Sequence, residues 1–137
     1  MIVSLQLANT DTEEEKQMVL LDIGDNNYEY AFKLKANYAN SYSSARYRQT
    51  QNTANKWKVN LKNSTEGAGT KATFWLAKDN DSYTRVSATH DVKQGSGAHY
   101  YNAYEKASQT DVRLAAENNN DSPNTYQISG VWDEETN

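Results

Sequence analysis

The sequence of 137 residues contains no cysteine, one proline and two histidines. Without cysteine it cannot form a disulfide scaffold, a CxxC redox site or a thiolate zinc site. The histidines, His90 and His99, stand outside any recognisable nucleophile or metal motif. The GxSxG, HExxH, Walker and GxGxxG patterns do not occur either. The sequence therefore predicts none of the active sites that these motifs mark.

Long apolar runs are also absent. Mean hydropathy is −0.98, and 36% of the residues are hydrophobic. No run approaches the roughly 18 apolar residues of a membrane-spanning helix. A chain of this size buries about two thirds of its unfolded surface, which is enough for a core without metal or disulfide. We therefore expect one soluble domain.

Charge is distributed unevenly along the chain. The net charge is −4, but residues 1–25 carry −5 and the remainder +1. We expect residues 1–25 to form an acidic leader that is a short helix, disordered, or the remnant of a clipped signal peptide. Residues 26–137 are predicted to form the single domain. Within it, residues 33–62 hold seven lysines and arginines and no acid.

Apolar and polar side chains alternate with a period of two in the domain. The clearest strands are 28–36 and 56–61, where rings and aliphatic chains alternate with lysines. Further strands are predicted at 46–50, 70–77, 83–88, 111–117 and 126–132, separated by turn clusters. Residues 98–108 fit either helical turns or a bulged strand. The predicted fold class is all-β: an antiparallel β-sandwich or jelly roll of seven or eight strands.

Cations interleave with flat rings at Arg46–Arg48 and Lys56–Lys58. Such pairs hold phosphates and stack on bases or sugars, although the outer face of any strand also presents cations to water. If the strands at 28–36 and 56–61 pair, their lysines form one positive face. The ten tyrosines exceed what a small core needs, and several fall in or beside loops. The predicted binding residues are Lys33, Lys35, Arg46, Tyr47, Arg48, Lys56, Lys58, Tyr100 and Tyr101.

Carboxylates suggest two further kinds of site. Asp79–Asp81 and Glu117–Asp121 supply oxygen ligands as calcium loops do, but the EF-hand pattern is not met and Asx-rich turns also explain them. We therefore predict no cofactor, with calcium as the one alternative. Glu66, Glu105 and Glu117 lie near turns and would suit a hydrolase, although the sequence does not fix their separation.

Four segments resemble a known family: NTANKWKVN at 52–60, TFWLA at 73–77, VKQGSGA at 92–98 and VWDEET at 131–136. The chain is similar there to small secreted Gram-positive proteins of unknown function, over residues 28–136. The resemblance implies export and an extracellular, cysteine-free β domain. It supplies no catalytic residue.

These observations give a ranked set of functional hypotheses. The first is an extracellular or cell-surface binding protein that engages an anionic polymer, glycan or other cell-envelope component through basic strands and loop aromatics. The second is a secreted antimicrobial or toxin-like effector, and the third a carboxylate-dependent hydrolase. An enzyme thus ranks below a binding protein. Nucleic-acid binding comes last, because the isoelectric point is about 5.1.

Overall fold

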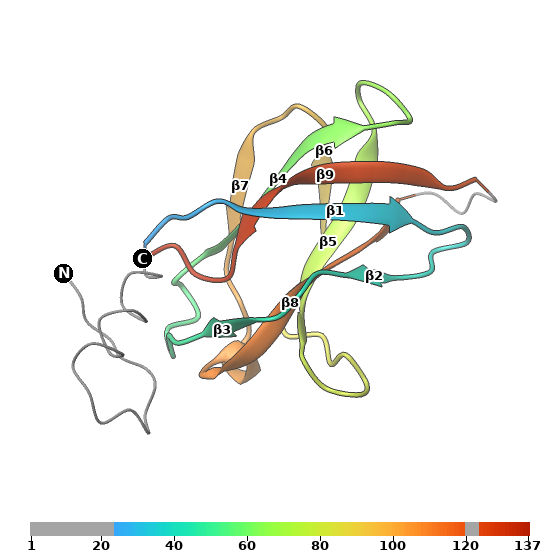
Figure 1. Ribbon diagram of the computed structural model, residues 1–137. Helices are drawn as coiled ribbons and strands as arrows, with labels where there is room; N and C mark the ends of the chain where they lie inside the picture. The colour runs from blue at the N-terminus through green and yellow to red at the C-terminus, as the bar shows by residue number, and fades with distance from the viewer. Residues whose placement is uncertain (1–23, 120–123) are drawn as a thin grey trace.

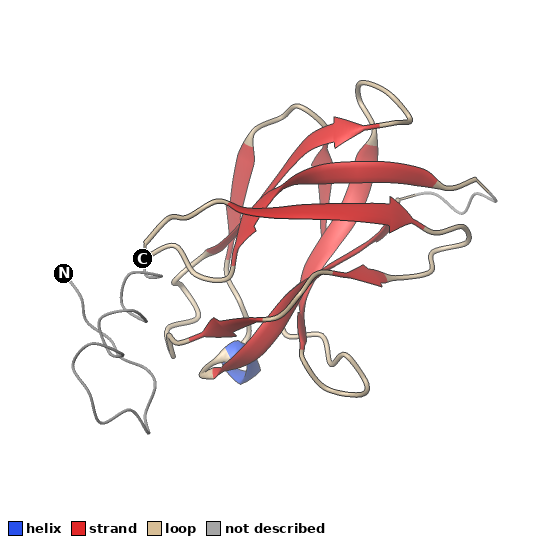
Figure 2. Cartoon of the chain, viewed as in Figure 1, coloured by secondary structure: helices blue, strands red, loops and turns tan. Residues whose placement is uncertain are grey.

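A computed structural model describes residues 24–119 and 124–137. Within them the chain forms nine strands and one 3-10 helix (Figures 1 and 2). The strands are β1 (Tyr28–Leu34), β2 (Ser41–Tyr42), β3 (Arg46–Arg48), β4 (Trp57–Ser64), β5 (Lys71–Lys78), β6 (His90–Lys93), β7 (Ala98–Tyr101), β8 (Thr110–Asn118) and β9 (Tyr126–Asp133), and the 3-10 helix η1 is Glu105–Ala107. The predicted all-β class is confirmed.

The strands form two antiparallel sheets that pack face to face (Figure 1). Sheet A has the order β1-β9-β4-β7. Sheet B has the order β2-β8-β5-β6, and β3 also pairs with β8. The architecture is the predicted antiparallel sandwich, with the hydrophobic core between the sheets.

Strand β1 shows why the alternating pattern predicts this arrangement. Tyr30, Phe32 and Leu34 are buried, while the residues between them are exposed. Their partners in the core come from both sheets, and include Trp57, Val59, Leu61, Phe74, Leu76, Leu114, Ile128 and Trp132. Burying each large apolar side chain contributes about 1.5–3 kcal/mol, so the core has enough apolar contact to hold the sheets together.

Gly130 of β9 lies close to the backbone of β4 and to the side chain of Tyr30. A Cβ atom at this position would be 1.9 Å from the carbonyl oxygen of Asn60 and 2.9 Å from the hydroxyl of Tyr30. That hydroxyl donates to the Asn60 carbonyl at 3.0 Å. The β4–β9 register shifts between Leu61 and Asn63, as at a β-bulge. Only glycine leaves room for this contact.

Two segments differ in detail from the sequence-based expectation. Residues 98–108 contain both the short strand β7 and the turn of 3-10 helix η1. The expected return strand at 83–88 is reduced to one bridge between Ala77 and Arg85, flanked by backbone hydrogen bonds from Lys78 to Thr84 and from Val86 to Leu76.

The structure expected for residues 1–23 lies outside the described residues. In the described part of the chain, no helix has the length and apolar character to cross a membrane.

The predicted pairing of the two clearest strands is wrong. Strand β9 lies between β1 and β4, pairing with β1 over residues 28–34 and with β4 over residues 58–64. Alternation specifies which face of a strand is buried, but it does not specify the neighbouring strand. The lysines of β1 and β4 therefore do not form adjacent rows.

Candidate functional site

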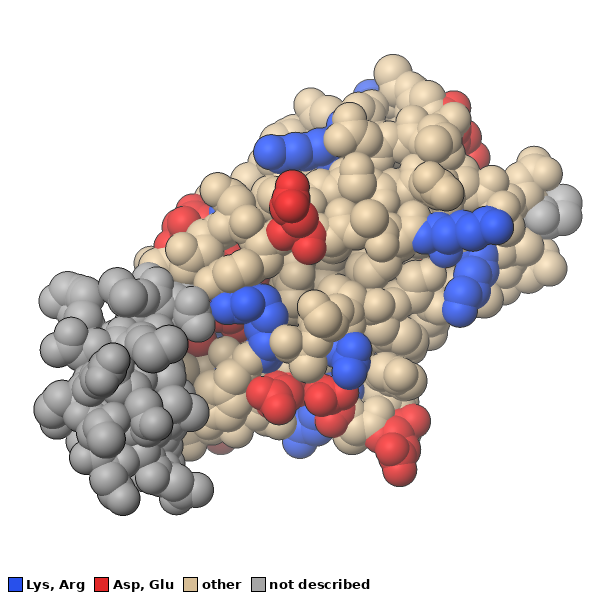
Figure 3. Space-filling view, in the orientation of Figure 1, with Lys and Arg blue, Asp and Glu red and all other residues tan. Residues whose placement is uncertain are grey.

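The predicted lysines of β1 and β4 lie at opposite ends of sheet A. Lys33 stands opposite Gln127 of β9, whereas Lys58 stands opposite Asp133. Six residues of extended strand separate these partners, a distance of about 20 Å at roughly 3.3 Å per residue. Figure 3 shows lysines and arginines in separate groups with acidic side chains among them, and no continuous positive patch on the face in view.

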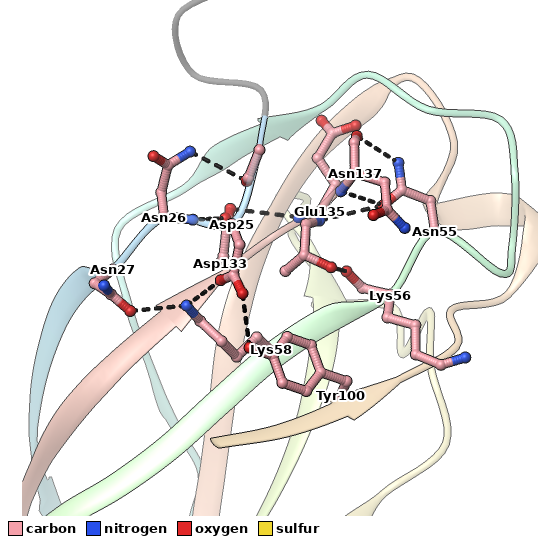
Figure 4. A network of polar contacts seen from close by, with 12 residues as sticks. Asp25, Asn26, Asn27, Asn55, Lys56, Lys58, Tyr100, Asp133, Glu135 and Asn137 are labelled. Carbon is pink, nitrogen blue, oxygen red and sulfur yellow. Dashed lines mark hydrogen bonds and ion pairs between the residues drawn. The ribbon is translucent and has the colours of Figure 1, made fainter. Parts of the chain in front are cut away.

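Lys58 points to the outer side of sheet A but is only 3% exposed. Its ammonium forms an ion pair with Asp25 and donates to Asn27 Oδ1 at 2.7 Å (Figure 4). The Tyr100 hydroxyl donates to the second Asp25 oxygen at 2.7 Å. The hydrogen bonds from Lys58 and Tyr100 lower the pKa of Asp25. The expectation that Lys58 faces water is wrong, because residues 25–27 cover it.

Arg48 is buried even more completely, with an exposed fraction of 1%. Its guanidinium donates to the backbone oxygens of Glu134, Asn55 and Asn52 at 2.5, 2.7 and 3.1 Å. Burial is the main cause of the lowered pKa of Arg48. In the β3–β8 register, the Arg48 side chain lies on the same inner face of sheet B as that of Val112, at one end of the core. Its predicted place on an exposed face is therefore wrong.

Three consecutive acids, Asp133 to Glu135, are buried beside these cations. Arg46 Nε donates to Glu134 Oε1 at 2.6 Å, and the Arg46 guanidinium lies 3.2 Å from the ring centre of Tyr28. The Glu135 carboxylate accepts from the backbone of residues 49 and 50 at 2.7 and 3.1 Å.

Burial raises the pKa of Asp133 to about 6 and that of Glu134 to about 9, and it also raises the pKa of Glu135. We call these residues the terminal charge cluster: Asp25, Arg46, Arg48, Lys58, Asp133, Glu134 and Glu135. In the sequence the three acids are only a run of negative charge, and the one signal of their burial is that they directly follow the core residue Trp132.

The other predicted binding residues lie in several places. Lys56 and Tyr100 share a hollow of about 550 Å³ with Asp25 and Asn137. Tyr47 is exposed opposite Asp111 on the outer face of sheet B. The Tyr101 ring stacks on His90, with ring centres 3.5 Å apart. Lys33 and Lys35 are exposed at the far end of β1. Of these residues, Lys56 and Tyr100 share a hollow, and Tyr100 also meets Lys58 at the Asp25 carboxylate.

A groove runs over the outer face of sheet A. One hollow of about 600 Å³ and a second of about 380 Å³ share Ala31, Asn63 and Ser129. Lys33 lines the first hollow, and Lys62 and Glu29 line the second. We call the two together the sheet-A groove. Its remaining lining is Tyr30, Phe32, Ser64, Thr65, Gly67, Ala68, Gln94, Gln127, Ile128, Gly130 and Val131.

Small outward residues on paired strands create the sheet-A groove. Ala31 and Ser129 are partners across β1 and β9, and Ser129 is also the partner of Asn63 across β9 and β4. Hydrogen bonds fix the walls: Asn63 Nδ2 donates to Ser129 Oγ at 3.3 Å, and Gln94 Nε2 donates to the Lys62 carbonyl at 2.7 Å. Sequence reasoning missed this site because its small residues carry neither charge nor rings.

Acidic side chains of the described residues bear on the calcium and hydrolase hypotheses. No group of three or more His, Asp or Glu side chains there is arranged to hold a metal ion. Asp79 pairs with Arg113 at 2.9 Å, and the Glu117–Asp121 segment lies partly outside the described residues. Each of the three hollows above is lined by at most one acid, whereas glycoside hydrolysis uses two.

Comparison with known proteins gives one match. A family model described as a protein of unknown function, DUF2712, matches residues 17–136. No curated protein and no solved structure matches the chain.

Proposed function

The chain belongs to the DUF2712 family, to which no function is assigned, and from its own geometry we propose that it is an extracellular cell-envelope binding protein that holds a glycan in the sheet-A groove. The observation that carries this proposal is the continuous groove over Ala31, Ser129 and Asn63. A concave site with a few fixed polar groups is the usual form of a ligand site.

The chemistry of the groove suits a sugar polymer. Its walls combine hydroxyls and amides, which both donate and accept hydrogen bonds, as sugar hydroxyls do. The floor residues Ala31 and Ser129 are small enough for a chain of rings to lie close to the sheet. Lys33 and Lys62 stand along the groove and supply positive charge for acidic substituents on the glycan.

The terminal charge cluster supports the same choice of site. Arg46, Arg48 and Lys58 already have internal partners, so they have little left to offer an external anion. A purely electrostatic surface would need such cations exposed, whereas the sheet-A groove uses shape and hydrogen bonding first. We therefore assign charge a secondary role in binding.

The test uses purified protein and insoluble Gram-positive cell walls in a co-sedimentation assay. Ala31→Trp places an indole in the groove from a position whose side chain is exposed, so the core is unaffected. We expect at least tenfold weaker binding. Lys106→Trp adds the same indole at an exposed position of η1, outside the groove, and should bind like the wild type. Equal binding by all three proteins would overturn the proposal.

A further inference from the structure

The outer face of sheet B, on the opposite side of the sandwich from the sheet-A groove, carries a second organised surface. Here Trp75, Ala77 and Ala115 form a small buried cluster separate from the core, with Tyr42 packed against it. Tryptophan on the outward face of a strand is expected to be exposed, yet Trp75 is only 2% exposed. The side chains around it come from strand β2 and from the loop between β5 and β6.

A stacked pair of tyrosines is the first part of that cover. The rings of Tyr42 and Tyr83 are 4.0 Å apart at an angle of 10°. Tyr83 keeps 40% of its surface exposed. The pair therefore presents an open ring surface beside Trp75.

The loop that carries Tyr83 adopts an unfavourable backbone conformation to place this ring. Tyr83 has φ of 47°, a conformation that costs a non-glycine residue about 1 kcal/mol or more. Asn80 holds the loop: its carbonyl accepts from the Tyr83 amide at 3.1 Å, and its Oδ1 accepts from the Thr84 amide at 3.0 Å. Local strain of this kind, kept by dedicated hydrogen bonds, is characteristic of functional positions.

Arg85 forms the second part of the cover. Its guanidinium lies 4.8 Å from the ring centre of Trp75, and Arg85 itself is exposed. A guanidinium in this position both shields the indole and offers donors to solvent. The outer face of sheet B thus joins three rings to one accessible cation.

Acceptor groups border the rings on the next row of the sheet. Thr73 of β5 stands between Glu117 of β8 and Asp91 of β6 in the strand register. Its hydroxyl donates to Asp91 Oδ1 at 2.7 Å. This row lies two residues from Trp75, a distance of about 7 Å along the strand.

A side-chain relay fixes one of these carboxylates relative to the tyrosines. In the amide orientation that satisfies both contacts, Asn40 Oδ1 accepts from the Tyr42 hydroxyl at 3.1 Å, and Asn40 Nδ2 donates to Glu117 Oε2 at 3.1 Å. Burial raises the pKa of Glu117, while Arg85 opposes this effect. Tyr42, Asn40 and Glu117 therefore hold one another in place before any ligand arrives.

We infer that this surface, which we call the aromatic face (Tyr42, Thr73, Trp75, Tyr83, Arg85, Asp91 and Glu117), is a second glycan site. A sugar ring stacks on Tyr83, and the hydroxyls of this ring and of its neighbours along the polymer bond to Arg85, Glu117 and Asp91. The ligand class is a β-linked polymer of gluco-configured sugars, because their equatorial substituents leave flat C–H faces that match a flat ring. This inference concerns the opposite sheet and does not depend on the sheet-A groove.

The two sites together would give the protein one glycan-binding surface on each side of the sandwich. Two sites on one rigid body raise avidity for a polymer network and allow cross-linking of separate strands. We therefore expect the protein to connect glycan strands as well as to bind them.

Two soluble probes test the aromatic face: chitohexaose and cellohexaose, measured by calorimetry and by tryptophan fluorescence. The wild type should bind at least one, with a change in emission from Trp75. Tyr83→Ala should weaken binding at least tenfold. Tyr104→Ala removes a tyrosine of similar exposure, 47%, from the loop before η1 and should have no effect. Circular dichroism and thermal unfolding establish that each variant is folded.

The outcomes separate the two sites. Ala31→Trp should leave oligosaccharide binding at the aromatic face unchanged, and Trp75→Phe should remove the emission change while calorimetry still detects binding. No binding of either probe by the wild type, or equal binding by folded Tyr83→Ala, would overturn the inference. If Ala31→Trp lost binding while Tyr83→Ala kept it, the probes would be bound in the sheet-A groove and the inference would be wrong.

Discussion

The basic stretch 33–62 supplies cations to two regions, one in which they are buried and one in which they are exposed. In the terminal charge cluster, Arg48 and Lys58 are buried and paired with groups of the protein itself. At the sheet-A groove, Lys33 and Lys62 are exposed. The two regions differ in burial and partners, and not in residue type.

A run of positive charge in the sequence is therefore not by itself a binding surface. Buried cations that already bond to protein oxygens act in stability, because moving them to an external ligand would leave those oxygens unpaired. Exposed cations beside a groove can act in binding. Four predictions test whether the two regions separate in this way.

The largest effect is expected for Arg48→Met. It removes the donors of three backbone oxygens and a positive charge that faces Glu135. Breaking a buried charge network in this way costs about 3–5 kcal/mol in the free energy of unfolding. Urea denaturation measures it. Lys33→Met is the matched control and should change the value by less than about 0.5 kcal/mol; similar losses in both variants would erase the distinction between the regions.

The stability of the protein should also depend on pH, because Asp133 is buried. The folded chain keeps a proton on Asp133, with its pKa of about 6, when the unfolded chain, with a pKa of 3.8, has lost it. Unfolding therefore releases a proton between about pH 4 and pH 6, so stability falls as the pH rises through this window. A pKa difference of about 2 corresponds to about 3 kcal/mol.

Urea denaturation at several pH values tests this dependence. Asp133→Asn removes the titrating group, and its stability should decline less steeply than that of the wild type. Some decline remains because the pKa values of Glu134 and Glu135 are also raised. Identical slopes for variant and wild type would show that Asp133 does not titrate as proposed.

Lys58→Met should have a smaller effect, about 1–2 kcal/mol. The variant leaves Asp25 without its ion-pair partner, but the Asp25 side chain is 43% exposed and water can replace the lost contact. Cell-wall binding should stay as in the wild type. A loss of binding without a loss of stability would mean that Lys58 contacts the glycan directly.

The smallest effect concerns the exposed cations. Replacing Lys33 and Lys62 together with glutamine should leave stability unchanged and weaken cell-wall binding about threefold at low salt. The difference should vanish at about 0.5 M salt, where exposed charges are screened. A tenfold or greater loss that persists at high salt would mean that charge, rather than groove shape, dominates binding.

The sequence predicts individual strands better than their assembly. Alternation correctly identifies β1 and β4, because one buried face leaves a period of two in the residues. It does not reveal that β9, nearly 100 residues after β1, inserts between them. It also cannot show that residues 25–27 fold over Lys58, since burial there comes from a distant segment.

The candidate sites show the same limit. Lys33 was predicted from its charge and does line the sheet-A groove, and Tyr42 and Tyr83 belong to the predicted loop aromatics. Ala31 and Ser129, which form the groove floor, have no chemical signature in the sequence. Their importance arises only from their pairing across β1 and β9.

Backbone NMR during titration with soluble glycan chains released from Gram-positive cell walls would locate the binding site on the folded protein. We predict that the amide signals of Ala31, Asn63 and Ser129 shift in a saturable way, while those of Arg46–Arg48 and Lys56–Lys58 stay in place. Shifts confined to the latter two segments, with none along the sheet-A groove, would contradict the assignment of binding to the groove.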